Sequence, residues 1–300
     1  MKKILAATLF LSALTLHIQA TTVFQTTSAA GGVDFNSATP WGTAPASGND
    51  YVTTPGLVAG TVTAGYPTTT ATLRGAIVAN ETFAGHSLTI AGNTLFLLKS
   101  AANDVLTVNN LTLNDQAFMD WANNASAYSC QLTGSMKIAA GNAYILNNNS
   151  GNAIFNISST LTGSGTLNMG DDRSSETINL NGDLSGFAGN LTFMTVGNFK
   201  IGNASALTLG STTLTFTTAG AGSAFTLQND LTVAALNIKG TSIANGTYTG
   251  SQLDTLAGVT TFSGLGKTIT VGAVPEPGTY ALLLAGFGVL IGIKKFRRLA

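Results

Sequence analysis

Residues 21–273 repeat one short motif, in which leucine and threonine are followed by an apolar residue. The same residues contain no convincing amphipathic helix. The motif begins at Leu88, Leu106, Leu111, Leu191, Leu207, Leu214 and Leu231. Its apolar and polar residues alternate with a period of two, which is typical of a β-strand with one buried face. Threonine is β-branched and favours strands. The chain is therefore expected to be all-β.

Glycine and asparagine separate these units, and both tolerate the positive φ angles of tight turns. Units restart at Leu88, Leu111, Leu132, Leu161, Leu191, Leu214 and Leu231, in steps of 17 to 30 residues. Most of these steps suit one solenoid coil for each unit, because solenoid repeats are about 20–45 residues long. We expect a right-handed parallel β-helix over residues 21–273, with an irregular N-terminal cap over 21–80. A short helix over 251–256 would close the other end. A β-sandwich is the alternative.

The composition excludes several classes of protein. Only 9% of the residues are charged, with 13 basic and 13 acidic side chains. There is no basic surplus of the kind that nucleic-acid binders show. A single cysteine excludes an internal disulfide and a cysteine-rich zinc site. We expect no metal, no cofactor and no nucleic-acid partner.

Residues 1–20 have the three parts of a secretory signal peptide. Lys2 and Lys3 form a basic start, residues 4–16 are mostly apolar, and Ala20 offers a small residue for cleavage. The alternative is a short membrane anchor, but 13 apolar residues at about 1.5 Å each fall short of a ~30 Å hydrocarbon core. Export is therefore the expected fate of the chain.

A second apolar segment, residues 278–293, lies near the C-terminus and is followed by Lys294, Lys295, Arg297 and Arg298. Its 16 uncharged residues make a marginal transmembrane helix. Positive residues stay on the cytoplasmic side, so the four basic residues orient the body away from the cytoplasm.

Pro275, Glu276 and Pro277 precede this segment, and two prolines around one residue favour a stiff, extended spacer. Pro-Glu-Pro, an apolar segment and a basic cluster, in that order at the end of the chain, resemble the PEP-CTERM sorting tail of Gram-negative bacteria. The resemblance implies recognition by exosortase, a membrane-embedded enzyme that releases or transfers the exported body. A plain membrane anchor is the alternative. The expected division is signal peptide 1–20, body 21–273 and sorting tail 274–300.

A second resemblance supports the solenoid. Residues 161–167 read Leu-Thr-Gly-Ser-Gly-Thr-Leu, and residues 186–189 read Gly-Phe-Ala-Gly before the Leu-Thr-Phe at 191–193. These sequences resemble the autotransporter-associated β-strand repeats of passenger domains over roughly 160–235. No membrane β-barrel translocator is recognisable at the C-terminus, where the expected sorting tail stands instead.

Processing at both ends would change the net charge. The body between the signal peptide and the tail keeps 7 basic and 12 acidic residues, a net charge of −5. A mildly acidic body has no electrostatic attraction to nucleic acid or anionic lipid.

Few residues suggest catalysis. His86 is the one histidine left after residue 17 is removed, and no nucleophile elbow accompanies it. Cys130 is expected to be buried, since it has no evident activating partner. The cluster from Asp171 to Glu176 could serve glycoside chemistry or hold calcium, but a solvated turn is the favoured interpretation. Asp115 and Asp120 form a weaker acidic pair near Trp121, and a sugar could stack on the ring of Trp121.

The body is therefore expected to be non-enzymatic. We expect a structural or adhesive protein, held transiently in the inner membrane and then sorted to the cell surface or extracellular polysaccharide matrix. Exosortase is the expected processing partner, and polysaccharide is a further candidate partner. The alternatives are a polysaccharide lyase or hydrolase on the same fold, or an ice-binding surface. Ice binding would use Thr-x-Thr pairs such as Thr61/Thr63, Thr213/Thr215 and Thr268/Thr270.

Overall fold

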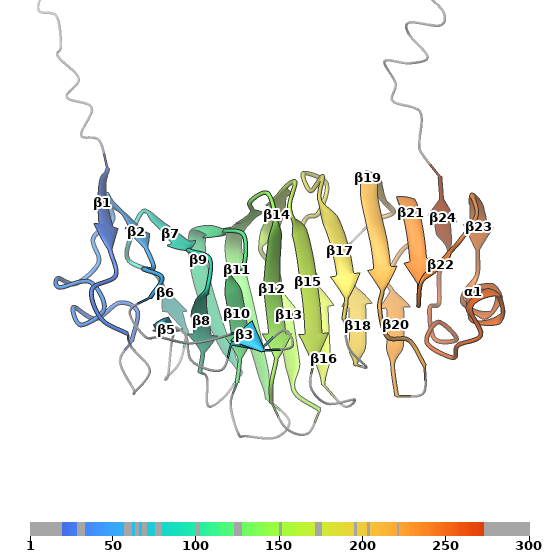
Figure 1. Cartoon of the computed structure of the whole chain (residues 1–300), viewed down its shortest axis with the longest axis horizontal. Helices are drawn as coiled ribbons and strands as arrows, with labels where there is room; N and C mark the ends of the chain where they lie inside the picture. The colour runs from blue at the N-terminus through green and yellow to red at the C-terminus, as the bar shows by residue number, and fades with distance from the viewer. Residues whose placement is uncertain are drawn as a thin grey trace, which may run out of the picture.

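The computed structural model describes residues 20–28, 34–56, 62–63, 66–67, 71–75, 80–99, 103–122, 128–149, 152–171, 176–194, 197–202, 205–220 and 222–272. These residues form short strands and one helix, α1 (Gly250–Ala257), arranged as an elongated β-solenoid of about seven turns (Figure 1). The expected all-β solenoid is confirmed, and the β-sandwich alternative is not what forms. The handedness of the solenoid stays a prediction.

The strands of the first large sheet, with the hairpin strands, have the following bounds: β1 (Thr21–Phe24), β2 (Asn49–Val52), β3 (Val62–Thr63), β4 (Tyr66–Pro67), β6 (Glu81–Thr82), β7 (Ser87–Ile90), β9 (Asp104–Leu113), β11 (Ser129–Ile138), β13 (Ile154–Ile157), β14 (Thr160–Gly163), β16 (Thr177–Leu180), β18 (Asn198–Ile201) and β20 (Ala224–Leu227).

The strands of the second large sheet have the following bounds: β5 (Ala71–Gly75), β8 (Thr94–Leu98), β10 (Phe118–Trp121), β12 (Asn142–Asn147), β15 (Thr166–Asp171), β17 (Asn190–Phe193), β19 (Leu207–Phe216), β21 (Leu231–Ile238), β22 (Thr241–Ser242), β23 (Gly246–Tyr248) and β24 (Ile269–Val271).

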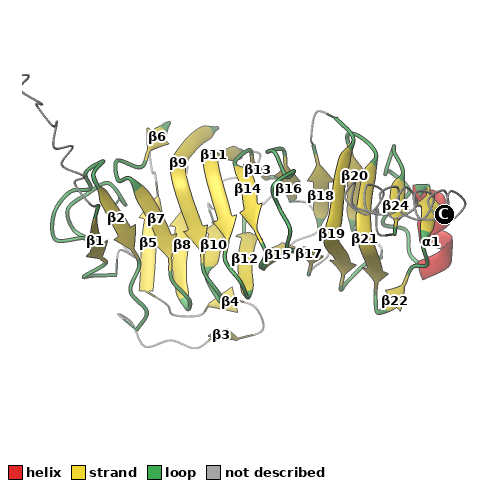
Figure 2. Cartoon of the chain, turned by 90° about the horizontal axis from the view of Figure 1, so that it is seen from above, coloured by secondary structure: helices red, strands yellow, loops and turns green. Residues whose placement is uncertain are grey.

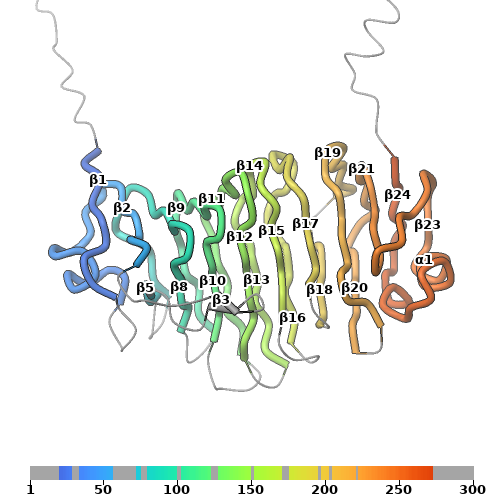
Figure 3. The backbone as a smooth tube through the Cα atoms, viewed as in Figure 1, coloured from blue at the N-terminus to red at the C-terminus, as the bar shows by residue number. Residues whose placement is uncertain are grey.

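Two sheets run the length of the solenoid, and their strands lie across its long axis (Figure 2). The first has the order β1-β2-β7-β9-β11-β13-β16-β18-β20, and the second β5-β8-β10-β12-β15-β17-β19-β21-β24-β23. Successive coils pair in parallel along both sheets. Among the described strands, antiparallel pairing occurs in the hairpin β3–β4 and at the C-terminal end, where β21 pairs β22 and β23 pairs β24. Figure 3 follows the coils in sequence from one end to the other.

From β7 to β21 the coils are more regular than the spacing of leucines suggests, with register partners 21 to 26 residues apart, whereas partners lie 37 residues apart between β2 and β7 and 38 apart between β21 and β24. Register partners on neighbouring coils lie 26 residues apart at Thr107 and Thr133 and 23 apart at Asn156 and Asn179. The expected steps of 17, 29 and 30 residues are not coil lengths, because the counted leucines belong to different strands of the coil. Leu161, for example, lies in the first sheet and Leu191 in the second.

The core lies between the sheets and follows from the alternation in each strand. In β16, β18 and β20 every second residue is buried. Because neighbouring coils are in register, buried apolar side chains lie next to one another in columns. One such column consists of Phe155, Ile178, Phe199 and Phe225. Each fully buried leucine or phenylalanine stabilises the fold by about 1.5–3 kcal/mol relative to an exposed one. The column explains how a chain with so few charges holds together.

The outer face of the second sheet is also covered near β10. Phe118 and Leu146 are almost fully buried, yet they lie outside the continuous core cluster that contains their neighbours Met119 and Ile145. The ring of Phe118 stacks on that of Tyr144, with centroids 4.7 Å apart. The hairpin β3–β4 lies outside the sheet beside β10 and β12 in both views (Figures 1 and 2). This part of the sheet is therefore packed on two sides.

Each end of the solenoid core is closed by its own set of side chains. At the N-terminal end Phe35, Trp41, Tyr51 and Phe83 form a buried aromatic cluster, in which Phe35 and Phe83 stack at 5.3 Å. At the other end Leu253 of α1 is fully buried. Helix α1 covers the last coil at the position expected for a short helix (Figure 1).

The described part of the chain contains no helix long and apolar enough to cross a membrane. The signal peptide, apart from Ala20, and the sorting tail lie outside the described residues.

Candidate functional site

The sorting residues expected from the sequence flank the solenoid. Ala20 is exposed and directly precedes β1. Pro275, Glu276 and Pro277, with Lys294, Lys295, Arg297 and Arg298, lie outside the described residues. The last described residue, Gly272, follows β24 directly, so only two residues separate the solenoid from the Pro-Glu-Pro motif.

His86 is paired with an acid that the sequence did not indicate. Its Nδ1 atom lies 2.8 Å from Oδ1 of Asp50, 36 residues earlier in the chain. The Ser87 hydroxyl donates to the same Asp50 oxygen at 2.5 Å. Both hydrogen bonds hold the pKa of Asp50 below its ordinary value, and the bond from Ser87 has the larger effect. Ser87 donates to the acid and not to the imidazole, so these three residues lack the serine-to-histidine bond of a nucleophilic triad.

Cys130 is buried, as expected. It is 2% exposed and unpaired. Burial, with the nearby charge of Asp104, raises the pKa of its thiol to about 12. At neutral pH the group is therefore a protonated, shielded thiol, and it is unsuited to act as a nucleophile.

The acidic residues singled out in the sequence do not converge. Asp115 lies in the turn after β9, where its Oδ1 accepts the backbone N–H of Asn142 at 2.7 Å. Asp120 is nearly buried within β10, between Leu97 and Leu146 of the neighbouring strands. Asp171 ends β15. Its side chain and residues 172–175 lie outside the described residues.

Two further expectations about this region are wrong. Glu176 is fully buried, and neither of its carboxylate oxygens has a hydrogen-bond partner among the described residues. It is therefore not part of a solvated turn. Trp121 is also fully buried and packs against Phe155 in the core, with ring centroids 5.9 Å apart. It cannot stack on a sugar at the surface. Within the described ranges no three His, Cys, Asp or Glu residues gather as a metal site would need.

The Thr-x-Thr pairs considered for ice binding do not stack on one another. Thr213 and Thr215 of β19 lie beside Ala235 and Asn237 of β21, so the neighbouring coil does not repeat the pair. Thr268 precedes β24, and its hydroxyl donates to Asp230 at 3.0 Å. Thr63 is in β3, and Thr61 lies outside the described residues. These pairs form no repeated flat array.

The outer surface carries single columns of neutral polar side chains instead. Thr208, Thr232, Thr270 and Thr247 are register partners on four adjacent strands near the C-terminal end. The last two hydroxyls are 2.9 Å apart. On the first sheet Asn156 accepts hydrogen bonds from the side chains of Asn179 and Asn181 at 2.9 and 3.1 Å. Strand spacing of about 4.8 Å sets the repeat of such columns.

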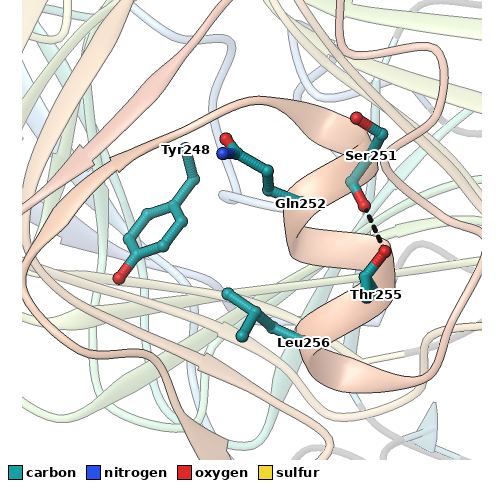
Figure 4. Close-up of a pocket in the computed structure, with 5 residues that line it drawn as sticks. All are labelled: Tyr248, Ser251, Gln252, Thr255 and Leu256. Carbon is teal, nitrogen blue, oxygen red and sulfur yellow. Dashed lines mark hydrogen bonds between the residues drawn. The ribbon is translucent and has the colours of Figure 1, made fainter.

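One pocket at the C-terminal end combines an aromatic ring with polar groups. It has a volume of about 470 Å³ and is lined by Tyr248, Ser251, Gln252, Thr255 and Leu256 (Figure 4). This pocket was not predicted from the sequence, although Thr249 and Gln252 have the spacing of a helix capping box. A second hollow of about 540 Å³, lined by residues including Asn181, Asp183 and Thr208, has no aromatic lining residue.

The comparisons with known proteins concern the tail. Residues 273–298 match the family model described as the PEP-CTERM protein-sorting motif. The match contains the Pro-Glu-Pro residues and all four basic residues singled out in the sequence. No curated protein and no solved structure matches the chain. The sorting motif is thus confirmed, whereas the resemblance to autotransporter-associated repeats stays a prediction.

Proposed function

We propose that the chain is an exported, non-enzymatic β-solenoid that exosortase sorts through its C-terminal tail to the surface of a Gram-negative bacterium. The observation that carries the proposal is the sorting motif at residues 273–298, which begins directly after Gly272, the last described residue. The body would serve a structural or adhesive role in the envelope or the extracellular polysaccharide matrix. The inner membrane would hold the precursor only until it is processed.

The surface chemistry supports this role. The columns of threonine and asparagine present neutral donors and acceptors at the spacing of the strands. A polysaccharide can make many such contacts at once, so a weak affinity for each contact can sum to firm attachment. The net charge of −5 calculated for the body gives no attraction to nucleic acid.

The acids give no support to a polysaccharide lyase or hydrolase. General acid and base catalysis needs two carboxyl groups within about 5–10 Å on either side of one bond. Asp115 lies in the turn before β10, Asp120 is packed within that strand, and Glu176 is buried elsewhere. No shared surface collects these three acids.

The sorting step is tested in the native host by replacing Pro275, Glu276 and Pro277 with alanine. Intact mass and cell fractionation are measured for both proteins. The wild type should lack residues 1–20 and roughly 275–300 and be recovered from matrix or medium. The variant should keep its tail and remain in the membrane. A control with alanine at Thr241, Ser242 and Lys267, all exposed in the body, should be processed normally.

Normal processing of the Pro-Glu-Pro variant would overturn the proposal. A wild type that keeps its tail and stays in the membrane would also overturn it, because the tail would then be a simple anchor.

A further inference from the structure

The pocket on the C-terminal cap has rigid walls. The Tyr248 hydroxyl donates to the carbonyl oxygen of Ala244 at 2.9 Å, and Tyr248 pairs with Ile269 in the β23–β24 ladder. These bonds hold the ring in place before any ligand arrives. Leu256 lies across the hollow from the ring, and 55% of its surface is exposed (Figure 4). An aromatic face and an aliphatic side chain thus form an open apolar cleft.

The polar groups around the cleft are held just as firmly. Oε1 of Gln252 accepts the backbone N–H of Thr249 at 2.8 Å and its hydroxyl at 3.0 Å. This capping box fixes the amide, which Figure 4 shows directed toward Tyr248. The Nε2 group of Gln252 donates to no described residue. The Thr255 hydroxyl donates to the Ser251 carbonyl at 2.9 Å, so its oxygen can still accept. The cleft therefore offers both donors and acceptors.

No charged side chain lines the pocket. Asp254 belongs to the same helix, but its Oδ1 accepts the backbone N–H of Phe262 at 2.8 Å and serves the cap itself. Nothing in the lining offsets the desolvation of an ionic ligand. The pocket is thus suited to a neutral ligand that has an apolar face and hydroxyl groups at its edge. A pyranose ring has this character, with C–H groups on its faces and hydroxyls around them.

We propose that this pocket binds a sugar ring of a neutral polysaccharide, stacked on Tyr248 and hydrogen-bonded by Gln252 and Thr255. The volume of about 470 Å³ lies within the ~300–1,000 Å³ of ligand pockets. The pocket is open, so the sugar chain can continue beyond the bound ring. All five lining residues precede residue 273 and remain in the body after loss of the tail. The choice of a polymer over a free sugar rests on the proposed function.

Affinity electrophoresis of the full chain in detergent tests the site. The gels contain dextran, galactomannan, hydroxyethyl cellulose or the neutral polysaccharide of the host, and polygalacturonate serves as the anionic comparison. At least one neutral polymer should retard the protein, and polygalacturonate should not. Tyr248→Ala should weaken the binding about tenfold, the effect of losing ~1.4 kcal/mol of contact. Tyr248→Phe keeps the ring and should remain within about threefold of the wild type.

Two further variants distinguish a loss of binding from a loss of folding. Gln252→Glu retains an acceptor for the capping box but removes the N–H donors and adds a charge, so binding should fall while the helix persists. Phe24→Ala removes an aromatic ring that is 59% exposed at the opposite end of the solenoid and should change nothing. Circular dichroism and thermal unfolding check each variant.

Three outcomes would overturn the proposal: no neutral polymer is bound, polygalacturonate is bound as well as the neutral polymers, or Tyr248→Ala and Gln252→Glu bind like the wild type. The last result would place binding on the polar columns. The assay uses purified protein and needs no processing, so its failure is distinguishable from a failure of the sorting experiment.

Discussion

Phe193 and Phe216 stack inside the solenoid with ring centroids 4.6 Å apart and planes inclined by 16°. They are register partners on β17 and β19, so the stack of strands places one ring on the other. Phe225 and Phe262 meet the Phe216 ring edge-on at 5.0 and 4.9 Å. Phe262 follows α1 in the chain. The aromatic cluster therefore links the last coils to the C-terminal cap.

Replacement of Phe216 by alanine should lower the free energy of unfolding by about 3–5 kcal/mol, because the ring is buried and the rigid strands cannot close the cavity. Phe216→Leu should cost less, about 1.5 kcal/mol. Urea unfolding monitored by circular dichroism measures both. The exposed Phe24→Ala variant is the control and should change stability by less than about 0.5 kcal/mol. Equal losses for Phe216→Ala and Phe24→Ala would contradict the packing argument.

Stability should depend on pH through a carboxyl group near the N-terminal end. Burial and the neighbouring Asp34 raise the pKa of Glu81 to about 7, although Asn36 donates to its Oε1 at 2.7 Å. A raised pKa means that the folded state favours the protonated acid. Below pH 4.5, the ordinary pKa of a glutamate, the protonated Glu81 contributes its full share to the free energy of unfolding. This share is lost as the pH rises toward 7.

The variant Glu81→Gln isolates this effect, since it cannot ionise. Thermal unfolding of the wild type should show stability falling between pH 4.5 and 7, and the variant should lack that fall. Asp50, Asp183 and Asp230 have lowered pKa values, so their contributions are lost only as the pH falls below about 3.8. The two pH windows do not overlap. Identical profiles for wild type and variant would refute the prediction.

Cys130 should resist thiol reagents in the folded protein. Its pKa of about 12 leaves almost no thiolate at pH 8, and its side chain is buried against the core. With Ellman's reagent we expect no reaction in buffer and one thiol equivalent in 6 M guanidinium. Rapid labelling of the native protein would show that β11 opens readily. The variant Cys130→Ala gives the background.

The register between β11 and β9 shifts directly after Gly134, and the backbone at this corner of the coil requires glycine. Its φ of +100° is unfavourable for other residues, and a Cβ atom there would collide with the carbonyl oxygen of Val108 on the preceding coil. Gly134→Ala should therefore destabilise the protein by at least ~1–2 kcal/mol. Gly48→Ala is the matched control, because a Cβ at Gly48 would meet nothing within 4 Å. Equal melting temperatures for the two variants would contradict the assignment of this corner.

Some of the functional geometry was beyond sequence reasoning, and the reason is distance along the chain. His86 shows no sign in the sequence of its partner Asp50, 36 residues away. Trp121 and Glu176 read as surface residues beside acids, yet the stacking of coils buries both. Tyr248 and Leu256 are close in the chain, but whether they line one pocket depends on the direction that α1 takes after β23. Each of these contacts depends on how the chain turns between strands.

What the sequence determined by itself was local. Alternation of leucine, threonine and a further apolar residue favours strands wherever it occurs, because side chains on a strand point to opposite faces. The sorting motif is likewise read from contiguous residues, 273–298. Only the tertiary structure decided which strands share a column, since the turns vary in length and shift each coil against the last. That register places Phe216 on Phe193.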